Sequence, residues 1–281
     1  RMYKLYLFAL ILCAFSILTS CKQTNNSNMK QPKAKKIAKE MVMHGHSRID
    51  NYYWLNEREN PEVIDYLNAE NSYTKEVMKN TEVLQDEIYK EIVGRIKQTD
   101  ESVPYNYNGY SYYVKFEEGL EYPIYCRKNL DKGSKEEIFL DGNSMAEGHS
   151  YFQIGGWKFS TNNEILAYSV DTVSRRKYDI YFKNTLTNST FDEVISNTTG
   201  NVVWANDNQT VYYQVKDETL RSYRIYKHEV GTSVNNDVLI YEEADPTFSV
   251  YVYKTKSDKN LVISSESTLS SECRILDADT P

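Results

Sequence analysis

The sequence predicts a mainly β protein in which a partial β-propeller of about three to four blades follows an N-terminal helical arm. Tyrosine is enriched, with 25 of 281 residues, and tyrosine favours half-buried strands. From about Val103 the hydrophobic period changes from the 3.6 of a helix to the 2 of a strand. Polar turns that precede hydrophobic strands begin at residues 108, 162, 206 and 257. Their spacing of about 45 to 55 residues is the length of one four-stranded propeller blade.

Residues 1–20 are predicted to be a secretory signal peptide. A basic start is followed by an apolar run from Leu5 to Leu18, which is shorter than the roughly 20 residues of a membrane-spanning helix. The Leu-Thr-Ser-Cys run at residues 18–21 resembles a bacterial lipobox. Cleavage before Cys21 would leave this cysteine lipidated, and several acyl chains would anchor it stably in a membrane. An unlipidated signal peptide is the alternative.

Residues 21–40 are predicted to be a lipid-anchored flexible tether. Residues 22–39 hold six lysines and no acidic residue, so they cannot bury enough apolar surface to offset the entropy of ordering. The lysines would lie near anionic lipid head groups. We therefore expect an exported, membrane-anchored lipoprotein of the periplasm or cell envelope.

Residues 41–98 are predicted to form the helical arm. Asn60 is a suitable N-cap, with Pro61 at the first helical position. A second helix is predicted to begin near Asn80 or Thr81. Apolar residues four apart form one stripe on this helix: Leu84, Ile88, Ile92 and Ile96. The stripe is either exposed in this chain or packed on the propeller.

Residues 99–281 are predicted to form the partial propeller. Apolar and polar residues alternate over residues 110–115, and a turn at Glu117–Gly119 leads to a second strand at residues 122–127. This pattern is typical of a β-hairpin. A β-sandwich would also alternate strands and turns, but the regular spacing favours propeller blades.

The charge of the chain bears on its partners. Eight of the 33 basic residues precede residue 40, which leaves 25 basic against 40 acidic side chains, a formal charge of −15. This sign disfavours nucleic-acid binding. An acidic body attracts basic peptides, although plain solubility explains the same charges. Glu242, Glu243 and Asp245 form an acidic cluster that contributes to interdomain ion pairs, guides basic peptides, or is only a solvated face.

We find no catalytic machinery in the sequence. Acyl transfer needs an activated nucleophile and an oxyanion site, but there is no Gly-x-Ser-x-Gly motif. Ser47, Ser144 and Ser150 are near glycines and are expected to be turn and loop residues. The four histidines are expected to be structural hydrogen bonders, and no pattern predicts a metal or cofactor site. Cys126 and Cys273 are expected to be buried free thiols, with a disulfide between them as the alternative.

The strongest signal is a set of short runs in a fixed order. Asp-Asn-Tyr-Tyr-Trp-Leu at residues 50–55 leads into a helical run at Pro61–Asn71. Further runs follow: Glu-Tyr-Pro-Ile-Tyr (121–125), Leu-Asp-Gly-Asn (140–143), Ala-Tyr-Ser-Val-Asp (167–171), Tyr-Lys-His-Glu-Val-Gly-Thr (226–232) and Asp-Val-Leu-Ile-Tyr-Glu-Glu (237–243). Together they resemble the N-terminal part of the prolyl oligopeptidase family of serine peptidases, most closely its oligopeptidase B (protease II) group.

The resemblance implies a fold and an activity for the whole protein. Members carry a seven-bladed propeller that caps a C-terminal α/β-hydrolase domain, which holds a Ser-Asp-His triad and is absent from this chain. Oligopeptidase B relatives cleave short peptides after Arg or Lys, so short basic peptides are the expected substrates of the full-length enzyme. This chain alone is expected to be inactive and to expose unpaired strand edges.

Two alternative functions remain open. A non-catalytic propeller lipoprotein would bind a ligand or partner, but a stand-alone propeller has no use for an apolar-striped helical arm. A proline-specific oligopeptidase is the other alternative. The runs at residues 121–125 and 228–232 resemble the relatives that cleave at basic residues more closely.

Overall fold

The computed structural model describes residues 29–281, and the chain divides into two compact units between Ile96 and Lys97. The predicted signal peptide, residues 1–20, and the predicted lipidation site Cys21 lie outside the described residues. Among the residues that the structure describes, none of the helices combines the length and the apolar character needed to cross a membrane.

The first unit opens with a β-hairpin that the sequence pattern did not predict. β1 (Lys39–Met43) pairs antiparallel with β2 (His46–Asp50). The chain before this hairpin is also held in place, because the indole N–H of Trp54 donates to the carbonyl oxygen of Lys35 at 2.9 Å. Part of the segment predicted as a flexible tether, residues 21–40, is therefore held by the first unit.

Two helices complete the first unit, α2 (Pro61–Met78) and α3 (Glu82–Gly94). Asn60 caps α2 as predicted, since its side chain accepts the N–H of Glu62 at 3.0 Å. The predicted apolar stripe is 46% to 57% exposed at each of its residues: Leu84, Ile88, Ile92 and Ile96. Short 3₁₀ helices lie at Tyr53–Asn56 (η1), Lys79–Thr81 (η2) and, in the second unit, Val234–Asn236 (η3).

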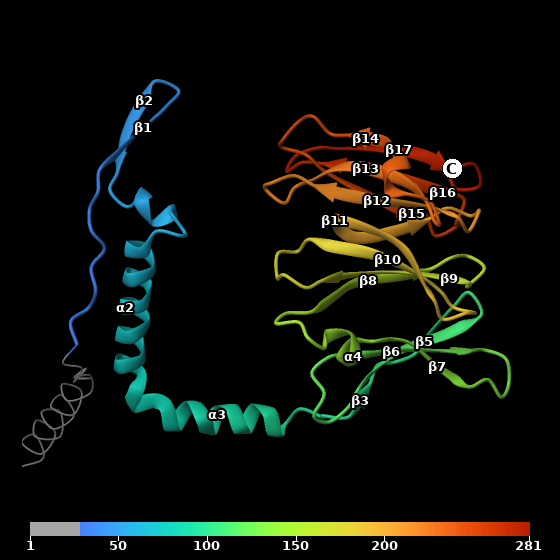
Figure 1. The fold of residues 1–281 in the computed structure, drawn as a ribbon, viewed down its shortest axis with the longest axis horizontal. Coiled ribbons are helices and arrows are strands. Elements are labelled where there is room, and N and C mark those ends of the chain that lie inside the picture. Colours follow the sequence, from blue (N-terminus) through green and yellow to red (C-terminus); the bar gives the residue numbers. More distant parts are fainter. Residues whose placement is uncertain (1–28) are drawn as a thin grey trace, which may run out of the picture. The chain divides into compact units, whose positions relative to one another are not determined.

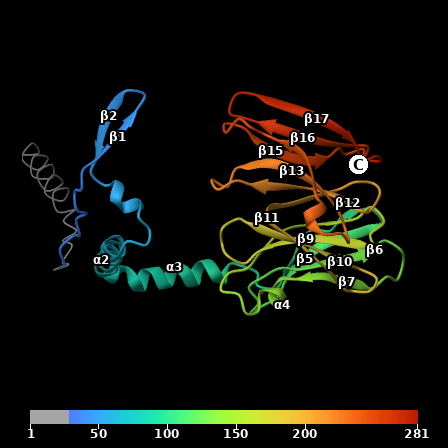
Figure 2. The same ribbon diagram turned by 45° about the horizontal axis from the view of Figure 1, so that its top comes forward.

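The second unit consists of antiparallel sheets that follow one another along the chain, from β7 (green) to β17 (red) in Figures 1 and 2. The first sheet contains β3 (Asp100–Glu101), β4 (Tyr105–Tyr107), β5 (Tyr110–Phe116), β6 (Ile124–Asn129) and β7 (Glu136–Asp141). Both β3 and β4 pair with β5, and β6 lies between β5 and β7. The hairpin predicted from the alternating pattern corresponds to β5 and β6.

A seven-stranded sheet holds the next two blades. After the short helix α4 (Gly142–Ala146) its strands are β8 (Gln153–Phe159), β9 (Ile165–Asp171), β10 (Tyr178–Asn184), β11 (Thr190–Trp204), β12 (Thr210–Lys216), β13 (Ser222–Glu229) and β14 (Val238–Glu242). The first half of β11 pairs with β10, and the half from Thr198 to Trp204 pairs with β12. One long strand thus ends one blade and begins the next, which merges the two blades into one hydrogen-bonded sheet.

The last sheet has three strands: β15 (Ser249–Lys254), β16 (Asn260–Glu266) and β17 (Ser271–Asp277). Residues 29–281 therefore contain a first blade of five strands, two four-stranded blades that share β11, and a three-stranded fourth blade. This arrangement confirms the predicted partial propeller of three to four blades.

The hydrophobic cores lie between successive blades. Three clusters fill these spaces, and they centre on Tyr112, Phe139 and Leu166, on Phe182, Trp204 and Val211, and on Tyr212, Val250 and Ile263. Cys126 and Cys273 are free thiols as predicted. Cys273 is exposed rather than buried, because β17 is the edge strand of its sheet.

Four polar turns lock neighbouring blades together. Hydrogen bonds join them in sequence: Asn108 Nδ2 to Thr161 O (2.7 Å), Asn162 N to Asn208 Oδ1 (2.8 Å) and Asn206 Nδ2 to Asp258 O (2.9 Å). These turns precede β5, β9, β12 and β16, so all four strands begin on one side of the propeller, the turn side, and end on the opposite side, the loop side. β3 pairs with Lys115 and Phe116 at the end of β5, so it also lies on the loop side.

Candidate functional site

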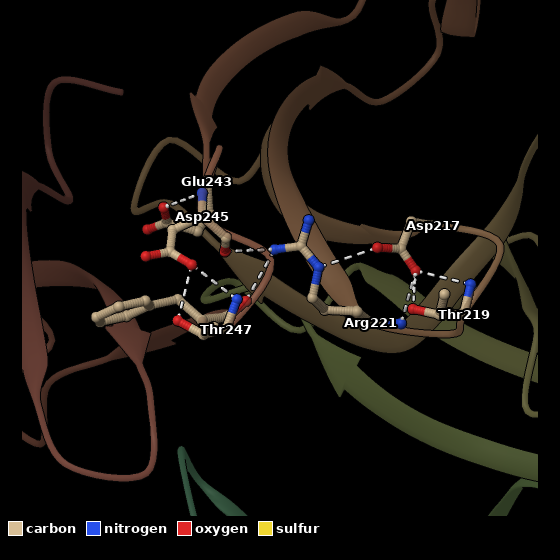
Figure 3. A network of polar contacts seen from close by, with 7 residues as sticks. Asp217, Thr219, Arg221, Glu243, Asp245 and Thr247 are labelled. Atoms are coloured by element: carbon tan, nitrogen blue, oxygen red, sulfur yellow. Dashed lines mark hydrogen bonds and ion pairs between the residues drawn. The ribbon is translucent and has the colours of Figure 1, made fainter. Parts of the chain in front are cut away.

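The predicted acidic cluster lies on the loop side. Glu242 is the last residue of β14, and Glu243 and Asp245 follow in the connection to β15. This connection lies against residues 217–221, the loop between β12 and β13 (Figure 3). The three acidic residues are therefore neighbours in space, but each carboxylate has its own partners.

Glu242 is paired with Arg224 of the adjacent strand. The two residues lie opposite each other in the register of β13 and β14. Nε of Arg224 donates to Oε2 of Glu242 at 3.0 Å, and Nη2 donates to Oε1 at 3.3 Å. The hydrogen bond raises the pKa of Arg224. A partly exposed pair of this kind stabilises a fold by about 0–1 kcal/mol, so its main effect is to neutralise the Glu242 carboxylate.

Glu243 and Asp245 are satisfied by groups close by. The Glu243 carboxylate accepts the hydroxyls of Ser265 and Tyr241 and the N–H of Asp245. Asp245 accepts the N–H and the hydroxyl of Thr247, at 2.8 and 2.7 Å. The pKa values of both carboxyls are lowered, chiefly by Ser265 for Glu243 and by the Thr247 N–H for Asp245. Both groups are therefore ionised acceptors and are poorly suited to proton transfer.

Arg221 joins the two loops into one unit (Figure 3). Its Nε donates to Oδ2 of Asp217 at 2.9 Å, and its Nη1 donates to the carbonyl oxygens of Asp245 and Phe248 at 3.2 and 2.8 Å. Asp217 also accepts the hydroxyl and the N–H of Thr219. These bonds, that of the Thr219 hydroxyl above all, lower the pKa of Asp217 to about 2. The arrangement presents a negative, internally fixed surface.

The lowered pKa of Asp217 predicts a pH-dependent contribution to stability. Its unfolded-state pKa is about 3.9, so ionised Asp217 stabilises the fold above about pH 4, and this stabilisation is lost as the pH falls towards 2. Asp217→Asn is expected to lower the free energy of unfolding at pH 7, and its difference from wild type is expected to shrink between pH 4 and pH 2. Urea unfolding at pH 7, 4 and 2.5 measures this difference.

The control for this experiment is Glu218→Gln, which removes an exposed charge from the same loop and leaves the bonds to Arg221 intact. It is expected to change the free energy of unfolding by no more than about 0.5 kcal/mol. A difference between Asp217→Asn and wild type that stays constant down to pH 2.5 would contradict the assignment.

A second charged loop, which the sequence pattern did not single out, lies beside the first. We call residues 172–177, between β9 and β10, the basic loop. Asp171 is buried at the end of β9 and accepts four backbone N–H groups, from Val173 (2.8 Å), Ser174 (3.0 Å), Arg175 (3.0 Å) and Arg176 (2.7 Å). A buried aspartate at a strand end, followed closely by Ser-Arg-Arg-Lys, is the sequence signal that marks this loop.

Lys216 links the basic loop to the acidic one. Its ammonium donates to the carbonyl oxygen of Arg176 and lies 5.8 Å from the ring centroid of Tyr178. Burial lowers the pKa of Lys216, and Arg176 lowers it further. Because Lys216 ends β12 and Asp217 follows directly, loops of opposite charge lie next to each other on the loop side.

His228 is a structural hydrogen bonder, as predicted. It lies fully buried in β13, where Nδ1 donates to Oδ1 of Asp237 at 2.6 Å. The hydroxyl of Tyr213 donates to the other oxygen of Asp237 at 2.6 Å. The imidazole stacks on Phe182, with ring centroids 5.6 Å apart. This cluster ties β12, β13 and the η3 segment together.

The serines near glycine take part in local structure. Ser47 lies in β2, not in the expected turn, and its hydroxyl donates to Glu40. Ser144 lies in α4 and donates to the carbonyl oxygen of Asp141 at 3.2 Å, and Ser150 lies between α4 and β8. Within residues 29–281, His, Cys, Asp and Glu side chains form no group of three that could hold a metal ion.

The sequence behind this architecture matches a known family. The family described as prolyl oligopeptidase, N-terminal beta-propeller domain, matches residues 32–281. The chain belongs to the prolyl oligopeptidase family. The resemblance predicted from the short runs is therefore confirmed. Within residues 29–281 the structure contains the arm and the propeller blades of this family and no α/β-hydrolase domain.

Individual members of the prolyl oligopeptidase family are similar over most of the chain. This chain is 41% identical to dipeptidyl aminopeptidase BI of Pseudoxanthomonas mexicana over 256 residues, and the match covers 85% of this chain and 35% of that protein. This chain is 33% identical to Protease 2 of Moraxella lacunata over 260 residues, and the match covers 90% of this chain and 38% of that protein. The structure of oligopeptidase B from Leishmania major matches this chain with a TM-score of 0.83 at 32% sequence identity, and the match covers 90% of this chain and 38% of that protein. The chain thus spans little more than a third of these relatives.

Proposed function

We propose that this chain is the arm and propeller region of an exported, oligopeptidase B-like serine endopeptidase that cleaves short peptides after Arg or Lys. The observation that carries the proposal is the similarity to oligopeptidase B over 90% of the chain, with a TM-score of 0.83. The acidic loops support the choice of basic peptides, because a surface with one sign of charge attracts ligands of the opposite sign. The reacting groups would belong to a hydrolase domain.

The propeller would act by exclusion and closure. A ring of blades over an active site admits short peptides, keeps out folded proteins and shields the reaction from bulk water. We propose that the loop side faces the hydrolase domain. Both the acidic loops and β3, the first strand after the arm, lie on this side.

A second candidate is a dipeptidyl aminopeptidase, which the 41% identity to dipeptidyl aminopeptidase BI favours. Such an enzyme removes dipeptides and therefore needs a free N-terminal amine on its substrate. An endopeptidase tolerates a blocked one. Acetylation of the peptide N-terminus consequently separates the two candidates.

The test uses the full-length protein and N-acetylated pentapeptides with Arg, Lys, Pro or Ala before the cleaved bond. We expect the Arg and Lys peptides to have a kcat/KM at least about a hundredfold above the Pro and Ala peptides, because a site built for a cation leaves buried carboxylates unpaired when the ligand is neutral. A serine-directed inhibitor is expected to abolish turnover, and the 281-residue chain is expected to be inactive. The same pentapeptides with a free N-terminal amine are assayed in parallel, and cleavage of these peptides without cleavage of the acetylated ones would favour the dipeptidyl aminopeptidase.

The same preparation tests localisation. Lipidation at Cys21 would place the activity in the membrane fraction, since each buried acyl methylene contributes about 0.8 kcal/mol. With Cys21→Ala we expect the activity in the soluble fraction. Equal distribution of wild type and variant would contradict the anchor and leave the peptidase proposal intact.

A further inference from the structure

The basic loop is built to hold its cationic side chains outward. Both carboxylate oxygens of the buried Asp171 are occupied by backbone N–H groups of the loop. Ser174 and Arg176 adopt left-handed conformations, with φ of 62° and 54°. The carbonyl of Arg176 is also held by Lys216. The backbone is therefore fixed from both sides, while the side chains of Arg175, Arg176 and Lys177 are exposed.

These cations are not neutralised within the described chain. Among the ion pairs of residues 29–281, none involves Arg175, Arg176 or Lys177. The carboxylate of Asp171 is directed at the loop backbone. The lowered pKa of Lys216, to which burial and then Arg176 contribute, is consistent with a positive potential here. This contrasts with the net negative charge of the body.

The neighbouring loop has the opposite sign. Asp217 and Glu218 follow Lys216 directly, and Arg221 ties Asp217 to the connection that carries Glu243 and Asp245. A ligand that spans both loops would therefore meet exposed cations at one end and carboxylates at the other. A short peptide with an Arg or Lys side chain and a free C-terminus carries both matching charges.

We propose that the basic loop binds the C-terminal carboxylate of short peptide substrates. This inference rests on the proposed peptidase function and deepens it, because it makes a free carboxylate close to the cleaved bond a part of substrate recognition. Guanidinium groups suit this role, since their planar fork matches a carboxylate with two parallel hydrogen bonds. A backbone that is already fixed loses less conformational entropy on binding.

Charge argues against a polyanion as the ligand. Three adjacent cations would attract a nucleic acid or an anionic lipid surface, but the flanking carboxylates and the formal charge of −15 from residue 40 onwards would repel it. A single carboxylate on a peptide that also carries a cation avoids this repulsion. The loop pair therefore favours a small zwitterionic ligand.

The test compares two matched peptides on the full-length enzyme. Both are N-acetylated and have Arg before the cleaved bond and two residues after it, and one ends in a free carboxylate and the other in an amide. Wild type is expected to show a KM about three- to tenfold lower for the acid, which corresponds to one or two exposed ion pairs. This ratio is expected to fall at high salt because exposed charges are screened.

Two double variants with equal net charge separate a local effect from a general one. Arg175→Gln/Arg176→Gln is expected to raise the KM for the acid and so to bring the acid-to-amide ratio of KM to about one. Lys132→Gln/Lys135→Gln removes two exposed cations from the loop between β6 and β7, on the turn side, and is expected to keep the wild-type ratio. An unchanged ratio in the first variant would overturn the inference.

A binding measurement tests the carboxylate site independently of the proposed peptidase activity. Fluorescence anisotropy of the labelled acid and amide peptides on the full-length protein, with its active serine blocked by inhibitor, does not depend on turnover. The carboxylate site is supported if the Arg175→Gln/Arg176→Gln variant binds the acid peptide more weakly than wild type does, and the Lys132→Gln/Lys135→Gln variant binds it as wild type does. Equal binding of acid and amide by wild type overturns it, even where the enzyme hydrolyses both peptides.

Discussion

Replacing Gly200 with alanine is expected to destabilise the junction between the second and third blades strongly. Gly200 lies in the bend of β11, where one blade ends and the next begins, and has φ of 87°. A Cβ at this position would lie 2.8 Å from Cγ of Tyr178 and 2.9 Å from Oγ of Ser169. Left-handed strain and overpacking together are expected to lower the free energy of unfolding by about 2–5 kcal/mol.

Gly231→Ala is the matched control. Gly231 has φ of 90°, but no atom lies within 4 Å of the position of its Cβ. This substitution carries only the left-handed strain of about 1–2 kcal/mol. Guanidinium unfolding of the 281-residue chain, followed by tryptophan fluorescence, compares the two. If the two substitutions lower the free energy of unfolding equally, Tyr178 and Ser169 move aside easily, and the junction between the blades is not tightly packed.

Replacing Asp237 with alanine is expected to have an effect of similar size for an electrostatic reason. The Asp237 side chain is 5% exposed and is the partner of both His228 and the Tyr213 hydroxyl. Its removal leaves two buried polar groups without this acceptor. Breaking a buried, hydrogen-bonded pair in this way typically lowers the free energy of unfolding by about 3–5 kcal/mol.

Asp192→Ala provides the comparison, because Asp192 is an exposed aspartate of β11 in the same sheet. Its loss is expected to change the free energy of unfolding by less than about 0.5 kcal/mol. Tyr213→Phe is expected to lower the free energy of unfolding by an amount between those of Asp192→Ala and Asp237→Ala, since it removes one hydrogen bond worth about 1 kcal/mol. If Asp237→Ala lowers the free energy of unfolding no more than Asp192→Ala does, the Asp237–His228–Tyr213 cluster contributes little to the stability of the third blade.

Local chemistry explains why much of the fold could be predicted. The N-cap of α2 depends on Asn60 and Pro61, which are adjacent in the sequence. The repeated polar turns use Asn108, Asn163, Asn208 and Asp258, all with φ between 44° and 63°. Asn and Asp tolerate this conformation better than most residues, so the spacing of these turns predicts the number of blades.

Contacts between distant residues explain what could not be predicted. The sequence pattern does not predict the β1–β2 hairpin, whose Val42, Met43 and Ile49 are exposed. The acidic cluster was recognised, but its partners Arg224, Arg221 and Ser265 lie on other strands or loops. The sequence pattern does not single out the basic loop, because the role of this loop depends on the burial of Asp171 and on the contact with Lys216.

The sequence by itself determined the class of this protein: its helical arm, its blade repeat and its family, because turns, caps and alternating strands depend on residues a few positions apart. Only the tertiary structure decided how charge is distributed over the loop side. Each carboxylate or cation there is fixed or left free by partners up to 40 residues away, and the folded chain alone brings those partners within hydrogen-bonding distance.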